Sequence, residues 1–152
     1  MATDNDNVIS TLNNLIETCK DGQNGFQAAA DGVKHSELKT LFHTYSQQRA
    51  QFAAELQAEV RRLGGDPEQT GSVAATLHRG WINIKSAVTG EDEAAVITEC
   101  ERGEDSAVKN YQDAINADLP ADVRAVVERQ YAQVKEAHDR IRALERATGA
   151  GA

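Results

Sequence analysis

The stretch SELKTLFHTYSQQRAQFAAELQAEVRRLGGDP, residues 36–67, decides the fold because it carries one long apolar stripe and then stops abruptly. Glycines followed by a proline form a stop signal for a helix. The stretch therefore predicts a helix over residues 36–63, with Ser36 as a capping residue. Its apolar side chains recur at helical spacing on one face, and they are Leu38, Leu41, Phe42, Tyr45, Phe52, Leu56, Val60 and Leu63.

The segment before this helix has the same pattern, from Val8 to Val33. It predicts a helix over residues 7–33, with Asp6 and Asn7 as candidate N-caps. Three glycines interrupt it, and each weakens a helix by roughly 1 kcal/mol relative to alanine. Their retention predicts a close backbone approach or a local bend, and makes this helix the weakest of the set. The glycines are Gly22, Gly25 and Gly32.

Two more long helices follow residue 90. The first is predicted over residues 91–116, because acidic residues in a first turn match the positive end of the helix dipole. The second is predicted over residues 120–147, with Pro120 tolerated in its first turn. Between residues 63 and 91, the segment VAATLHRGWINIKSAV predicts a helical crossover over residues 73–88, with Trp81 docking against the bundle or a neighbouring subunit.

This order of elements predicts an all-α protein. Short links join the first two helices and the last two, so each pair forms an antiparallel hairpin, and a long crossover joins the hairpins. That is the connectivity of a ferritin-like four-helix bundle. At 152 residues, the chain fits one such domain over residues 1–152.

Charge and hydropathy restrict the partners. The net charge is −8 and the sequence has no long run of lysine or arginine, which argues against nucleic-acid binding. No stretch is long and apolar enough to cross a membrane, and the polar N-terminal MATDNDN is unlike a signal peptide. We therefore expect a cytoplasmic protein. Cys19 and Cys100 are too few and too distant for a disulfide framework, and both are expected to be buried thiols.

The chain resembles the ferritin and bacterioferritin superfamily over nearly its full length, on VISTLNNLIETCKDGQNGF for a first bundle helix and EDSAVKNYQDAI for a third. Members of that superfamily bind two metal ions through one glutamate on each of two helices and a Glu-x-x-His pair on each of the others. The resemblance places these ligand positions on Cys19, Arg49, Phe52, Glu104, Lys135 and His138.

Only Glu104 and His138 keep a ligand of the superfamily's own type. Arg49 and Lys135 place cations where carboxylates are expected, and a cation does not ligate a metal. We therefore expect a degenerate di-metal site, in which Glu104 is neutralised by Arg49 or Lys135 and His138 is a hydrogen-bonded core residue rather than a ligand.

A nearer resemblance is to an uncharacterised family of bacterial ferritin-like bundle proteins, a domain of unknown function. It rests on LHRGWINIKSAVTGEDEAAVITECERGEDSAVKNYQDAI and EAHDRI, and it implies a fold without an established activity.

The leading hypothesis is a non-enzymatic protein that binds no cofactor and acts by association with a protein, which includes self-association into a homo-oligomer. A role in stress physiology is suggested only by analogy with other proteins of this fold. The alternative is a metal-binding protein, a di-metal oxidase or an iron-storage subunit, with ligands rearranged among Glu17, Cys19, Glu101, Glu104 and His138. A third hypothesis is a small apolar or thiol-reactive ligand bound between the helices near Cys19.

Overall fold

The computed structural model describes residues 2–67, 81, 84–90 and 92–148. Most of these residues are helical and none of them lies in a strand, which confirms the all-α prediction. The helices are α1 (Ala2–Gly32), α2 (Ser36–Arg62), α4 (Ile84–Thr89), α5 (Glu93–Asn116) and α6 (Ala121–Thr148).

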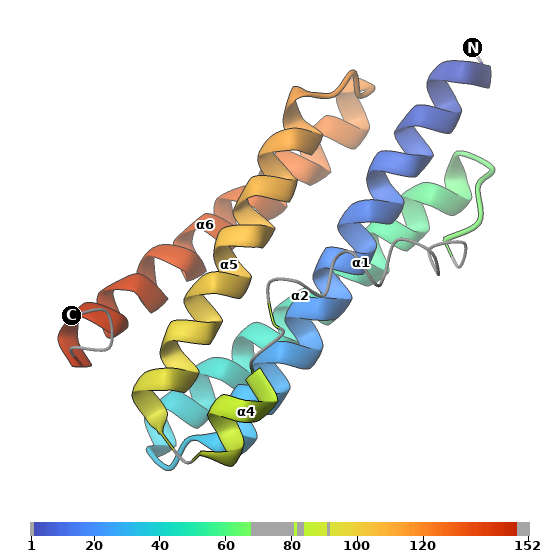
Figure 1. Ribbon diagram of the computed structural model, residues 1–152. Coiled ribbons are helices and arrows are strands. Elements are labelled where there is room, and N and C mark those ends of the chain that lie inside the picture. The colour runs from blue at the N-terminus through green and yellow to red at the C-terminus, as the bar shows by residue number, and fades with distance from the viewer. Residues whose placement is uncertain (1, 68–80, 82–83, 91, 149–152) are drawn as a thin grey trace.

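Figure 1 shows how the long helices run, and side-chain contacts between them fix their relative directions. Antiparallel α1 and α2 are joined by a short turn, as are α5 and α6. On α1, Thr18 accepts a hydrogen bond from Asn110 near the end of α5, whereas the turn after α1 meets Glu93 at the start of α5. Helices α1 and α5 are therefore antiparallel. The end of α2, which Asn5 ties to the start of α1, therefore lies at the opposite end of the molecule from the start of α5.

The stop signal after α2 acts through its glycines. Gly64 adopts a positive φ of 86°, a conformation that other residues rarely tolerate. The amide of Gly65 then donates to the carbonyl of Val60, and the amide of Gly64 donates to that of Arg61, which is the Schellman arrangement of a helix C-terminus. The predicted end of this helix at residue 63 is one residue beyond the observed end at Arg62.

The predicted caps were less accurate than the helices. Helix α1 begins at Ala2 rather than residue 7, so Asp6 and Asn7 lie inside it, and Asn5 ties its first turns to the carbonyl of Leu63. Ser36 is the first residue of α2 rather than its cap. His35 occupies the cap position, and its side chain makes no capping hydrogen bond to α2.

The later boundaries lie close to the predicted ones. Asp92 caps α5, because its carboxylate accepts hydrogen bonds from the amides of Ala94 and Ala95. Pro120 lies just before α6, and its carbonyl accepts the first hydrogen bond of that helix, from Arg124.

Trp81 docks the crossover onto the long helices, as predicted. Its side chain is buried and its ring centroid lies 5.0 Å from that of Phe26. A methyl group at Gly25 of α1 or Gly103 of α5 would overlap the indole ring, so these two glycines form the slot that receives it. From Ile84 onward α4 packs on α1 and α5, with Val88 against Gly32. The rest of the predicted crossover helix, residues 73–80 and 82–83, lies outside the described residues.

Two apolar clusters form the core. One contains Leu12, Leu56 and Val127, and the other contains Phe26 and Ile97. The boundary between the clusters falls between Tyr45 and Phe52 on α2 and between Cys100 and Ala107 on α5. Charged and polar side chains lie at this boundary.

Candidate functional site

An ion pair between α2 and α5 lies between the two apolar clusters. The guanidinium of Arg49 donates to both carboxylate oxygens of Glu104, at 2.6 and 2.9 Å. The two side chains are 1% and 0% exposed. Such a bidentate pair satisfies both carboxylate oxygens and two of the five N–H donors of the guanidinium inside the protein. This geometry confirms that Glu104 is neutralised by Arg49.

The surroundings of Arg49 hold it in this position. Gly22 of α1 leaves room for its side-chain carbons, the ring of Phe26 lies 5.4 Å beneath its guanidinium, and Gln48 accepts a hydrogen bond from its Nε. Burial disfavours the charged form, but Glu104 raises the pKa of Arg49 by more, so the net shift is upward. Arg49 is a permanent cation in the centre of the molecule.

A second buried network begins at Cys19 on α1. Its Sγ lies 3.2 Å from the hydroxyl of Tyr111, which donates to Gln130 of α6 at 2.7 Å. Gln130 in turn donates to Glu55 and to the carbonyl of Phe52 on α2. Burial raises the pKa of the Cys19 thiol to about 11 despite its hydrogen bond with Tyr111. Because the thiolate is the reactive and metal-binding form, Cys19 is an inert thiol at neutral pH.

The predicted position of Lys135 was wrong. Its side chain is 52% exposed and pairs with Asp139 on the same helix, at 3.4 Å, instead of reaching Glu104. The reason is helix phase. Val134 and Ala137 face the core, and each residue along a helix turns the side-chain direction by about 100°, so Lys135 points outward.

The superfamily's dinuclear metal centre does not fit these residues. The Arg49 guanidinium occupies the space beside Glu104, and Phe52 contributes a buried hydrocarbon ring. Lys135 and His138 on α6 contact other carboxylates. A pair of divalent ions would bring about four positive charges next to a buried cation, with Glu104 already engaged.

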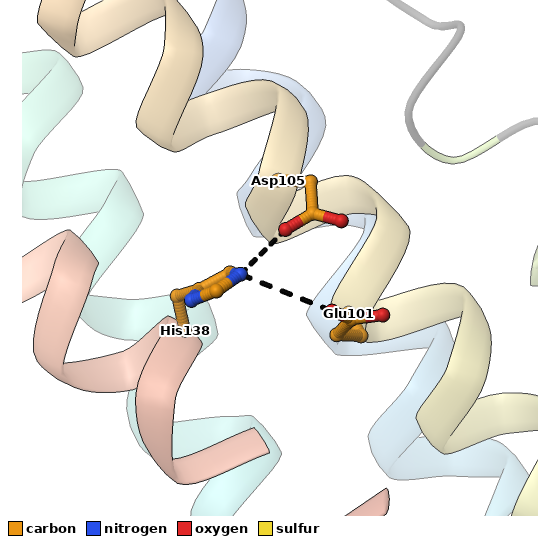
Figure 2. A group of neighbouring side chains, drawn as sticks. All are labelled: Glu101, Asp105 and His138. Atoms are coloured by element: carbon orange, nitrogen blue, oxygen red, sulfur yellow. Dashed lines mark hydrogen bonds and ion pairs between the residues drawn. The ribbon is translucent and has the colours of Figure 1, made fainter. Parts of the chain in front are cut away.

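His138 belongs to a different group of side chains, at the edge between α5 and α6 (Figure 2). Its Nε2 lies 2.5 Å from a carboxylate oxygen of Asp105 and 3.9 Å from one of Glu101. Its Nδ1 lies 3.2 Å from Asp139. The prediction that His138 is hydrogen-bonded is confirmed, and the residue is only 8% exposed, but its partners are carboxylates at the surface rather than core groups.

The carboxylates change the acid–base properties of this group. Burial lowers the pKa of His138, but Asp139 and Asp105 raise it by more, so the net shift is upward from 6.5. Burial, followed by the charges of Asp105 and Glu145, raises the pKa of Glu101. The group therefore concentrates negative charge around one imidazole.

The alternative set of rearranged ligands is only partly brought together. Glu101 and His138 meet, whereas Cys19 and Glu104 lie in the buried networks between the clusters. Glu17 lies buried on α1. Sequence reasoning missed Asp105, although it stands four residues after Glu101 and hence on the same face of α5. Among the described residues, Glu101, Asp105 and His138 form the group whose ligand atoms lie within 4.8 Å of one another.

These features define an all-α protein with a buried ion pair at its centre and a histidine–carboxylate group at its edge. The chain belongs to the family described as domain of unknown function DUF2383, whose model matches residues 7–117. The match includes the crossover and α5, and it ends before α6. A search of curated proteins finds no match. In the part of the chain that the structure describes, no helix has the length and apolar character needed to cross a membrane.

Proposed function

We propose that this chain is a ferritin-like four-helix-bundle protein that has an ion pair in place of a dinuclear metal centre, and that it acts by protein association rather than by catalysis. The order and directions of the helices support the fold assignment. Two antiparallel hairpins joined by a long crossover are the connectivity of that bundle class.

The observation that carries the proposal is the Arg49–Glu104 pair. Removing either partner alone would leave an uncompensated buried charge. The pair therefore provides inside the protein the charge balance that metal ions and several carboxylates provide in a dinuclear site. Arg49 occupies the space beside Glu104 that metal ions would need, which argues against oxidase or iron-storage chemistry at Glu104.

A surface on α2 and α6 supports association. An open hollow of about 400 Å³ is lined by Ser36, Glu37, Thr40, Leu41, Thr44 and Arg140. It presents hydroxyl groups, both signs of charge and one leucine, a mixture typical of the polar rim of protein interfaces. The net charge of −8 favours protein partners over nucleic acid. The cytoplasmic location stays a prediction from the sequence.

Metal loading tests the first half of the proposal. Tag-free protein is incubated with ferrous iron under anaerobic conditions, desalted and analysed for bound metal, for the wild type and for Glu104→Gln. We expect the two proteins to retain equal amounts of iron. A pair of iron atoms per chain that is lost in Glu104→Gln would overturn the proposal.

Sedimentation tests the second half. We expect the wild type to self-associate in a concentration-dependent manner and Thr40→Arg, in the hollow, to weaken this association. Gln51→Arg, on an exposed part of α2 outside the hollow, is the matched control and should behave as the wild type. A wild type that remains monomeric at all concentrations would contradict self-association through this surface.

A further inference from the structure

We propose that Glu101, Asp105 and His138 form a mononuclear binding site for a divalent transition-metal ion, with Zn²⁺ as the best fit. The site lies at the edge of α5 and α6, apart from the Arg49–Glu104 pair. The two proposals therefore stand or fall separately. What carries the inference is the convergence of three ligand atoms from two helices, together with the way the histidine ring is held.

The spacing of the ligand atoms suits a small ion. Zinc lies about 2.0 to 2.2 Å from nitrogen and carboxylate ligands, so two ligands in a tetrahedral site are roughly 3.4 Å apart. The His138 Nε2 lies 2.5 Å from Asp105 and 3.9 Å from Glu101. Binding would separate the first pair of atoms by about 1 Å and bring the second together by about half as much.

The mobility of the ligands allows this adjustment. The side chain of Asp105 is 57% exposed, so it can change rotamer without disturbing the core. His138 and Glu101 are held more firmly, because their side chains are 11% and 19% exposed. Figure 2 shows the imidazole of α6 pointing between the two carboxylates of α5.

The far side of the imidazole ring is already oriented for metal binding. Asp139 lies 3.2 Å from Nδ1. A ligating histidine commonly donates its second N–H to a carboxylate, which fixes the tautomer and directs the other nitrogen to the metal. When the Nδ1 proton is held by Asp139, Nε2 is the ring nitrogen directed at Glu101 and Asp105. On binding, the metal ion takes the place of a proton at Nε2, and that proton passes to solvent.

The donor set determines the class of ion. One imidazole nitrogen and two carboxylate oxygens favour a borderline transition metal, because Ca²⁺ and Mg²⁺ prefer sites made of oxygen ligands. Three protein ligands leave one tetrahedral position for water, since Asp105 is at the surface. Two carboxylates and one neutral imidazole also balance a 2+ charge, without the buried Arg49–Glu104 pair.

Calorimetric titration of chelator-treated, tag-free full-length protein with ZnCl₂ near neutral pH tests the proposal. We expect one Zn²⁺ per chain in the wild type, with His138→Ala and Asp105→Asn each abolishing saturable binding. Asp139→Ala should weaken binding by roughly 10- to 100-fold, as for other residues that orient a ligand. Circular dichroism of each variant establishes that it is folded. If His138→Ala proves unstable, Asp105→Asn still tests the proposal, because it changes an exposed side chain.

His43→Ala is the matched control, because His43 is an exposed histidine on α2 and its loss should leave the affinity unchanged. In a labelled sample, Zn²⁺ should shift the imidazole resonances of His138 and not those of His43. Wild-type protein without saturable binding would overturn the proposal, as would equal binding by Asp105→Asn. Tighter binding of Ca²⁺ than of Zn²⁺ would overturn the assignment of the metal class.

Discussion

At the scale of single residues, the charge that counters Glu104 comes from Arg49, and both side chains are almost completely buried. A buried ion pair is weak evidence for net stability, because desolvation of the two charges offsets much of their attraction. Its energetic importance lies in the cost of separating it. Removing one residue of the pair is far more destabilising than replacing both.

Glu104→Ala should therefore be strongly destabilising. We expect the free energy of unfolding to fall by about 3 to 5 kcal/mol, since the mutation leaves the Arg49 guanidinium buried without a counter-charge. Urea denaturation followed by circular dichroism measures this change. The double variant Arg49→Met with Glu104→Leu should recover most of the loss, because an apolar pair of similar volume can replace a buried ion pair.

An exposed ion pair provides the comparison. Lys135→Ala removes the surface contact with Asp139, and it should change stability by no more than about 0.5 kcal/mol. If Lys135→Ala cost as much as Glu104→Ala, or if the double variant were no more stable than Glu104→Ala, the central role of the buried pair would be refuted.

At the scale of elements, the glycines explain how the crossover is held. Gly25 and Gly103 accept the ring of Trp81 between α1 and α5, and Gly32 accepts Val88 of α4. The predicted close backbone approach is confirmed at these α1 glycines. Glycine at each position lowers the intrinsic stability of the helix, and it leaves room for a bulky side chain from the crossover to pack against the helix.

Gly103→Ala should partly expel Trp81. Alanine favours the helix by roughly 1 kcal/mol, but overpacking a filled site costs about 1 to 3 kcal/mol, so the net effect is destabilising. Trp81 is the single tryptophan of the chain, and its fluorescence emission should shift to longer wavelength. Ser106→Ala, on α5 and outside the slot, should leave the spectrum unchanged. An unshifted emission in Gly103→Ala would show that the slot does not hold the ring.

Helix α1 should exchange its amide protons faster than α6. Close packing at Gly22, Gly25 and Gly32 does not restore the helix propensity that these glycines remove. Native-state hydrogen exchange should show weaker protection in residues 20–33 than in residues 123–144. Equal protection of the two segments would mean that tertiary packing on α1 outweighs the intrinsic weakness of its sequence.

At the scale of the whole molecule, Glu93 joins the two hairpins. Its carboxylate accepts hydrogen bonds from the amides of Lys34 and His35, at 2.5 and 3.2 Å, and also contacts the His35 ring. These contacts tie the turn after α1 to the start of α5. The amide of Lys34, opposed by burial and assisted by His35, lowers the pKa of Glu93 below 4.5.

Acid should loosen this junction. A group with a lowered pKa in the folded state stabilises the fold above its unfolded-state pKa, and this contribution is lost as the pH falls through the folded-state pKa. We expect the free energy of unfolding to decline less steeply in Glu93→Gln than in the wild type between about pH 5 and pH 3. Glu128→Gln, at an exposed position of α6, should keep the wild-type slope. Identical slopes for all three proteins would contradict the prediction.

The sequence by itself determined the long helices and the break after Arg62. These features depend on apolar spacing within one helix and on glycine and proline signals, which act over a few residues. The cation beside Glu104 was instead predicted from the resemblance to the ferritin superfamily. The caps at the ends of α1 and α2 were predicted less well, because contacts such as Asn5 with Leu63 come from a distant part of the chain.

Only the tertiary structure decided which side chains from different helices meet. The relative rotation of α5 and α6 directs His138 to Asp105, and the docking of the crossover places Trp81 between two glycines. The physical reason is that one residue along a helix corresponds to about 100° of rotation. Packing between helices selects that rotation, and the periodicity of each helix taken alone leaves it open.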